Sequence, residues 1–213
     1  MIVNERMASF INSYAAPNSD FCEQLEQYSL KTNVPIVRKE MQTLMKFLLA
    51  MKKPHSILEV GTAIGFSAIL MAENTSPDCR ITTIEKYEKR IPLARENFEK
   101  SGYADRITFI EGDAADALKE LDGTFDFIFM DAAKGQYINF LPDIKRLLAP
   151  EGLLLSDNVM QDGDILESRY AVERRNRTIY ARMRDYLYEL TNDPELETVI
   201  LPVGDGVTIS VRK

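Results

Sequence analysis

The sequence contains no tryptophan, one histidine and only two cysteines. Cys22 and Cys79 lie far apart and lack the short spacing of metal ligands, so we expect two free thiols in a reducing compartment. No apolar run approaches the length that spans a bilayer, and the first residues lack the basic and apolar regions of a secretion signal. These absences favour a cytoplasmic protein without a membrane segment.

The sequence also lacks an excess of basic charge, because its formal net charge is −7. This balance argues against a protein that coats nucleic acid non-specifically, although a local basic patch stays possible. A length of 213 residues, with 28% charged and 45% apolar residues, is typical of one globular domain. Helical apolar periodicity in the first fifty residues predicts a helical extension over 1–53, followed by an α/β core over 54–213.

The segment from Ser56 to Ser67, SILEVGTAIGFS, reads as a strand, a glycine turn and the start of a helix. This is the opening unit of a nucleotide-binding α/β sheet. Gly61 and Gly65 are four residues apart, which differs from the dinucleotide pattern G-x-G-x-x-G and disfavours a dehydrogenase. Glu59 would repel a phosphate but favours an ammonium or a sulfonium, as in S-adenosylmethionine (SAM). An ordinary turn without a ligand is the alternative.

Strand-like and helix-like segments alternate after this unit, which predicts a parallel sheet with helices on both faces. The last two strand-like runs, 197–201 and 207–211, are joined by only five residues and should therefore pair antiparallel. The other expected strands lie at 56–60, 80–85, 106–110, 125–130 and 153–156.

Acidic residues gather at the carboxyl ends of these strands, where open α/β sheets bind ligands. Glu85 follows Gly61 by 24 residues and suits the acid that binds a ribose diol. Asp113 suits either an adenine amino group or a helix N-cap.

A metal site is expected at the ends of the fourth and fifth strands. Asp131 and the pair Asp157-Asn158 should lie side by side there, and hard oxygen ligands favour Mg²⁺ over zinc. Lys134 can reach the same place and could act as a general base, or could be an exposed loop lysine.

Together these motifs resemble those of the class I, SAM- and Mg²⁺-dependent O-methyltransferases related to catechol and caffeoyl-CoA O-methyltransferases. The resemblance covers the chain from about Val34 to the closing Gly-Asp-Gly-Val-Thr at 204–208. It implies an otherwise parallel, Rossmann-like seven-stranded sheet with an antiparallel last strand, metal ligation by Asp131, Asp157 and Asn158, and Lys134 as the base. The cofactor contacts that it implies are Val37, Glu59, Gly61, Ser67, Glu85, Ala114 and Asp131.

Two features bear on the acceptor. Ala132 and Ala133 stand where the catechol enzymes have a tryptophan and a histidine, so the aromatic residues that grip a flat catechol are missing. Between Arg169 and Arg184 six arginines face one acid, and on a helical wheel Arg174, Arg177 and Arg184 gather away from the apolar stripe. This face could bind phosphates, as in RNA, or could simply be solvated.

The overall pattern is most similar to bacterial enzymes that methylate 5-hydroxyuridine at the tRNA wobble position, which implies tRNA as partner. A methyltransferase of small catechols or phenolic CoA esters is the first alternative. A non-catalytic nucleotide- or RNA-binding module on the same fold is the second. The amphipathic first helix, with Met7, Phe10 and Ile11, and the family resemblance suggest a homodimer.

Overall fold

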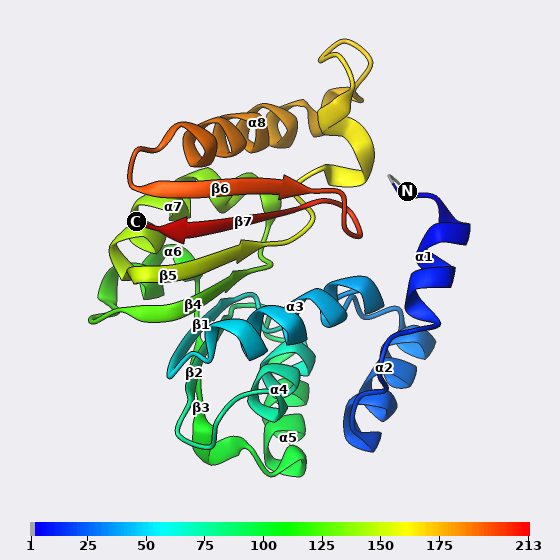
Figure 1. The fold of residues 1–213 in the computed structure, drawn as a ribbon, viewed down its shortest axis with the longest axis vertical. Helices are drawn as coiled ribbons and strands as arrows, with labels where there is room; N and C mark the ends of the chain where they lie inside the picture. The colour runs from blue at the N-terminus through cyan, green and yellow to red at the C-terminus, as the bar shows by residue number, and fades with distance from the viewer. Residues whose placement is uncertain (1–2) are drawn as a thin grey trace.

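The computed structural model describes residues 3–213 and contains one seven-stranded sheet with the order β3-β2-β1-β4-β5-β7-β6 (Figure 1). Strand β7 pairs antiparallel with both β5 and β6, and the other neighbouring pairs are parallel. The predicted Rossmann-like α/β fold is thus confirmed, including the antiparallel last strand. The strands are β1 (Ser56–Val60), β2 (Arg80–Glu85), β3 (Ile107–Glu111), β4 (Phe125–Met130), β5 (Leu148–Ser156), β6 (Leu196–Leu201) and β7 (Val207–Arg212).

Helices cover both faces of the sheet, because alternate side chains of the inner strands point to opposite sides. In β4, Phe127 and Phe129 belong to one hydrophobic cluster, and Ile128 and Met130 belong to the other. The first cluster is covered by α2 (Asp20–Thr32), α3 (Lys39–Lys52), α4 (Phe66–Glu73) and α5 (Ile91–Ser101). The second is covered by α6 (Ala114–Glu120), α7 (Tyr137–Leu147) and α8 (Arg177–Asn192).

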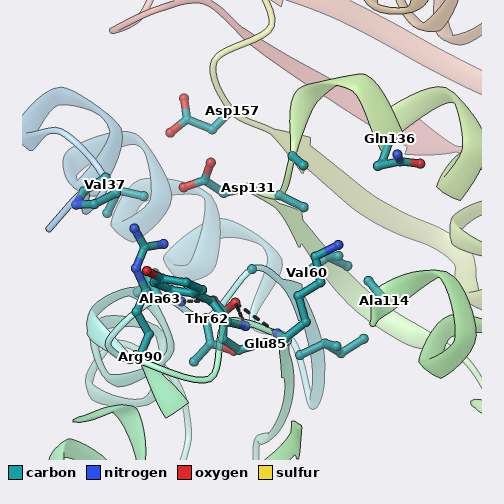
Figure 2. A pocket seen from close by; sticks show the side chains of 18 of the residues that line it. Val37, Val60, Thr62, Ala63, Glu85, Arg90, Ala114, Asp131, Gln136 and Asp157 are labelled. Carbon is teal, nitrogen blue, oxygen red and sulfur yellow. Dashed lines mark hydrogen bonds between the residues drawn. The ribbon is translucent and has the colours of Figure 1, made fainter. Parts of the chain in front are cut away.

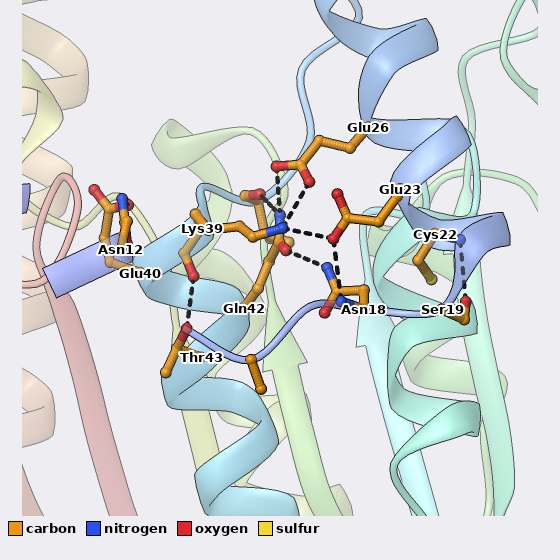
Figure 3. Close-up of polar contacts among 12 residues, drawn as sticks. Asn12, Asn18, Ser19, Cys22, Glu23, Glu26, Lys39, Glu40, Gln42 and Thr43 are labelled. Carbon is orange, nitrogen blue, oxygen red and sulfur yellow. Dashed lines mark hydrogen bonds and ion pairs between the residues drawn. The ribbon is translucent and has the colours of Figure 1, made fainter. Parts of the chain in front are cut away.

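The N-terminal helices pack on one face of the sheet and lead into the segment 34–38. Helix α1 (Glu5–Asn12) contacts α3, and α2 and α3 pack on α4. A polar network joins α2 to α3: Lys39 Nζ lies 2.8 Å from Glu23 and 3.0 Å from Glu26, and Gln42 donates to the Val37 carbonyl at 2.9 Å (Figure 3). This network fixes the extended segment 34–38, which lies over the carboxyl ends of the strands.

Several predicted boundaries were wrong. Strand β5 begins at Leu148 rather than 153, with a register irregularity against β4. The helical wheel includes Arg174, but α8 begins at Arg177: residues 169–173 form a loop and Arg174–Asn176 form a 3₁₀ turn.

Both cysteines are buried and free, as predicted. Within residues 3–213, no helix is long and apolar enough to cross a membrane.

Candidate active site

A cavity of about 580 Å³ opens at the carboxyl ends of β1, β2, β4 and β5, beneath the segment 35–38. Figure 2 shows side chains from all these elements around it. The predicted residues that line this cavity are Val37, Gly61, Ser67, Glu85, Asp113, Ala114, Asp131, Lys134, Asp157 and Asn158. The structure therefore brings together all but one of the predicted cofactor and metal residues.

The exception is Glu59, which is fully buried behind the cavity wall. One of its carboxylate oxygens accepts a hydrogen bond from Thr83 Oγ1 at 2.5 Å, and the other, Oε1, has no partner. Burial raises the pKa of the Glu59 carboxyl to about 7, although the hydroxyls of Ser67 and Thr83 act in the opposite direction. Glu59 therefore lies beneath the glycine turn and does not line the cavity itself.

The glycine turn lies directly against the end of β4. Gly61 has φ +104°, and a Cβ at this position would lie 2.1 Å from the Asp131 carbonyl oxygen. Its N–H donates to the Ile84 carbonyl at 3.0 Å. Only glycine fits here, so β1, β2 and β4 end close together around one point.

Glu85 is held rigidly at the end of β2. One carboxylate oxygen accepts from the Ala63 N–H at 2.8 Å, shown dashed in Figure 2, and the other accepts from the N–H groups of Lys86 and Tyr87 at 3.0 and 2.8 Å. These donors fix the orientation of the carboxylate, and the remaining lone pair of Oε2 is available to a hydroxyl in the cavity.

Asp113 caps α6, which was one of its two predicted roles. It accepts from the Ala115 N–H at 2.9 Å and pairs with Lys86 Nζ at 3.0 Å. The Ala115 N–H and the Lys86 ammonium hold the pKa of the Asp113 carboxyl below its usual value.

The predicted metal ligands lie at adjacent strand ends. Met130 of β4 pairs with Ser156 of β5, so the next residues, Asp131 and Asp157, come at equivalent places after the two strands. Figure 2 shows both side chains on the same side of the cavity. Asp157 is 4% exposed. Burial and the nearby Asp131 charge raise the pKa of the Asp157 carboxyl. Asn158 follows in the left-handed conformation, at φ 54°.

These donors fit a hard divalent cation. Two carboxylates and one side-chain amide line the same part of the cavity, and a cation there would offset the cost of holding the buried Asp157 ionised. Residues 3–213 hold no group of three or more His, Cys, Asp or Glu side chains suited to a metal, so a cation here would take the Asn158 amide as its third side-chain ligand.

Lys134 lies in the same corner. Its Nζ is 2.7 Å from Asp131 Oδ1 and 3.0 Å from the Tyr137 hydroxyl. Burial alone lowers the pKa of Lys134, but Tyr137 and the carboxylates of Asp131 and Asp157 outweigh it and raise that pKa above its usual value. The lysine is thus part of the site and not an exposed loop residue.

The sequence reasoning missed several residues of the site. Tyr137 is fully buried beside Lys134, and its only signal in the sequence is its place three residues after the lysine. The other missed lining residues include Arg38, Thr62, Ala63, Tyr87, Arg90 and Gln136. They lie in loops, where no periodicity shows which side chains face inward.

The predicted basic face is divided in the structure. Arg177 donates to the carbonyls of Val172 and Tyr170 at 3.1 and 3.4 Å, and Arg184 donates to the Ile165 carbonyl at 3.2 Å. Both therefore hold the preceding loop. Arg174 lies before α8 and is exposed.

Comparisons with known proteins agree with this geometry. A family model described as O-methyltransferase matches residues 12–213. Caffeoyl-CoA O-methyltransferase 1 of Eucalyptus globulus is 32% identical over 177 residues, covering 79% of this chain and 71% of that protein.

Solved structures give the same result. A Staphylococcus aureus protein, provisionally named a caffeoyl-CoA O-methyltransferase, is 32% identical with a TM-score of 0.90, covering 99% of this chain and 100% of that one. SAH-bound PaMTH1, a methyltransferase of Podospora anserina, is 30% identical with a TM-score of 0.86, covering 99% and 97%. The resemblance read from the motifs is thus confirmed: this chain belongs to the O-methyltransferase family.

Proposed function

We propose that this protein is a SAM- and Mg²⁺-dependent O-methyltransferase whose acceptor carries a hydroxyl next to a second oxygen. The observation that carries the proposal is the convergence of Asp131, Asp157, Asn158 and Lys134 at one end of a cavity whose other end contains Glu85. SAM would supply an electrophilic methyl group, and Mg²⁺ would supply positive charge for the acceptor oxygens.

The residues divide into a cofactor half and an acceptor half. In the cofactor half, Glu85 would bind the ribose, and Asp113 and Ala114 would hold the adenine. The turn at Gly61 would permit close approach of the methionine part, with Val37, Ser67 and the buried Glu59 nearby. The fit is supported by the fixed Glu85 carboxylate and by the Glu59 oxygen that lacks a partner.

In the acceptor half, Asp131, Asp157 and Asn158 would hold the metal. Its positive charge would offset the carboxylates that raise the pKa of Lys134. In that state the lysine amine would take the proton of the acceptor hydroxyl. Positioning the oxygen in line with the methyl group supplies much of the expected acceleration. Ala132 and Ala133 leave this half of the cavity without a tryptophan or histidine clamp.

A phenolic acceptor is the first candidate, because several relatives are named caffeoyl-CoA O-methyltransferases. The second is 5-hydroxyuridine in the anticodon loop of tRNA, whose 5-hydroxyl lies beside the 4-oxygen. The exposed Arg169, Arg174 and Arg175 favour it, because they lie in the segment that leads from the metal corner into α8 and could bind phosphates.

The test combines purified protein, labelled SAM and Mg²⁺ with two acceptor sets: caffeoyl-CoA and small catechols, and tRNA that carries 5-hydroxyuridine. Methyl transfer that EDTA abolishes, and that Asp157→Ala removes, would support the proposal. Arg174→Ala should weaken transfer to tRNA through KM and leave transfer to catechols unchanged. SAM binding without transfer to any acceptor would instead favour a non-catalytic binding module.

A further inference from the structure

Tyr137 combines complete burial with a polar contact to the proposed base. It is the first residue of α7, directly after the 3₁₀ turn Lys134–Gln136, and it has no solvent exposure. Its ring meets the Tyr186 ring edge to face, with centroids 5.4 Å apart and planes at 75°. The ring is thus fixed by packing, and so is the position of its hydroxyl.

The hydroxyl lies within hydrogen-bond distance of three groups. These are Lys134 Nζ at 3.0 Å, the Met130 carbonyl at 3.0 Å and the Asp157 carbonyl at 3.1 Å. A lysine nitrogen that donates must find an acceptor, so the Tyr137 oxygen accepts from Lys134 and its single proton goes to one of the two carbonyls. Tyr137 thereby links the lysine to the last residue of β4 and to the residue after β5.

These contacts restrict the direction of the lysine nitrogen. Nζ is tetrahedral: one position is its own side chain, the second donates to Asp131 Oδ1 at 2.7 Å, and the third donates to Tyr137. Only the fourth position is then free to contact the hydroxyl of a methyl acceptor in the cavity that Lys134 lines. Without the Tyr137 hydroxyl, only the contact with Asp131 would orient the amine, and two positions of the nitrogen instead of one would be open toward the cavity.

We propose that Tyr137 is a positioning residue, which aims the Lys134 nitrogen at the acceptor and ties together the strand ends that carry Asp131 and Asp157. This inference rests on the proposed function, in which Lys134 removes the acceptor proton. Misplacement of a catalytic group by about 1 Å can cost on the order of 100-fold in rate.

The test is Tyr137→Phe, which keeps the ring and removes the hydroxyl. With labelled SAM, Mg²⁺ and whichever of caffeoyl-CoA, catechol or tRNA the wild-type chain methylates, kcat should fall roughly 10- to 100-fold. The KM for SAM should stay within about twofold, because none of the three partners of this hydroxyl is one of the proposed cofactor residues. A kcat equal to that of wild type would overturn the inference.

Tyr186→Phe is the matched control. Tyr186 is equally buried and packs on the same ring, but its hydroxyl pairs with Ser156 Oγ at 2.6 Å and not with Lys134. A structural role alone would lower the melting temperature and kcat alike in both variants. Positioning predicts a similar loss of melting temperature in both and a large loss of kcat in Tyr137→Phe alone.

A second variant keeps the test decisive if Tyr137→Phe does not fold. A chain with 4-aminophenylalanine at position 137 retains a polar group at the same place, and it should keep a kcat above that of Lys134→Met. Equal kcat values in these two variants would count against positioning. If the wild-type chain transfers no methyl group to any acceptor, the proposed function fails, and the inference fails with it.

Discussion

At the scale of single residues, backbone contact limits what position 61 can hold. Gly61 has a positive φ, and a Cβ added there would approach the Asp131 carbonyl oxygen to 2.1 Å. Gly102 also has positive φ, at +76°, but a Cβ there would meet nothing within 4 Å. An alanine at either position would adopt an unfavourable positive φ, but only the alanine at position 61 would also clash with a neighbouring strand.

Gly61→Ala should destabilise the chain by several kcal/mol and abolish binding of S-adenosylhomocysteine, because the strand ends must separate. Gly102→Ala should cost only about 1 kcal/mol and leave binding intact. Chemical denaturation and titration calorimetry measure both effects. Equal losses in the two variants would show that strain alone matters at position 61.

The buried Glu59 carboxyl should make the free energy of unfolding depend on pH. Its carboxyl has a pKa of about 7 when folded, against a usual value of 4.5, so the unfolded chain ionises first as the pH rises. The ligand-free fold therefore loses stability between about pH 4.5 and pH 7, by up to about 3 kcal/mol at pH 8.

Glu59→Gln should remove this cost, so the variant without ligand should be more stable than wild type at pH 8 and nearly equal to it at pH 5. Thermal unfolding at the two pH values measures the difference. A stability gap that does not change with pH would contradict the assignment to this carboxyl.

At the scale of elements, α8 supports the loop that precedes it. Arg177 and Arg184 donate to carbonyls of residues 165–172, and the Tyr180 hydroxyl donates to the Glu167 carbonyl at 3.1 Å. Arg182 donates to the Gly135 carbonyl at 3.0 Å, next to Lys134. Helix α8 thus connects the loop 165–173 to the 3₁₀ turn that carries the proposed base, Lys134.

Arg177→Ala should free this loop, because two carbonyls lose their donor at a cost of about 1–2 kcal/mol. Limited proteolysis should then cut within residues 165–176 faster than in wild type. Arg174→Ala, in the same region but exposed, should leave the cleavage rate unchanged. Equal cleavage in both variants would show that Arg177 does not hold the loop.

Charge and periodicity could not predict this division of the arginines. A helical wheel places Arg177 and Arg184 on one polar face, but it also treats Arg174 as helical and does not show which carbonyls lie within reach. The residues at the strand ends were easier to predict from the sequence. The hydrophobic runs stop just before Asp131 and Asp157, and parallel strands bring such ends together. The role of Tyr137 depends on burial between two strand ends, which no local pattern shows.

At the scale of the whole molecule, α1 leaves an apolar surface uncovered. Met7, Phe10, Ile11 and Tyr14 are each at least half exposed, and Phe10 and Tyr14 stack edge to face at 5.2 Å. Apolar residues gathered in this way are typical of an interface. The homodimer suggested by the sequence would cover them.

Phe10→Ser combined with Ile11→Ser should therefore shift the chain from dimer to monomer in sedimentation velocity at micromolar concentration. Tyr188→Ser removes an equally exposed aromatic residue from α8 and should have no effect. A wild-type chain that sediments as a monomer would contradict the predicted dimer.

The antiparallel insertion of β7 has a consequence for how the protein is made. β5, which leads into Asp157, lies between β4 and β7, and the loop before β7 accepts hydrogen bonds from Val159 and Met160 through the Gly206 and Asp205 carbonyls. A ribosome synthesises residues 203–212 after every other part of the sheet. A nascent chain therefore has the glycine turn and Glu85 before β7 can pair with β5, the strand that leads into the proposed metal ligand Asp157. The proposed SAM-binding residues can therefore assemble during synthesis before the proposed metal ligands do.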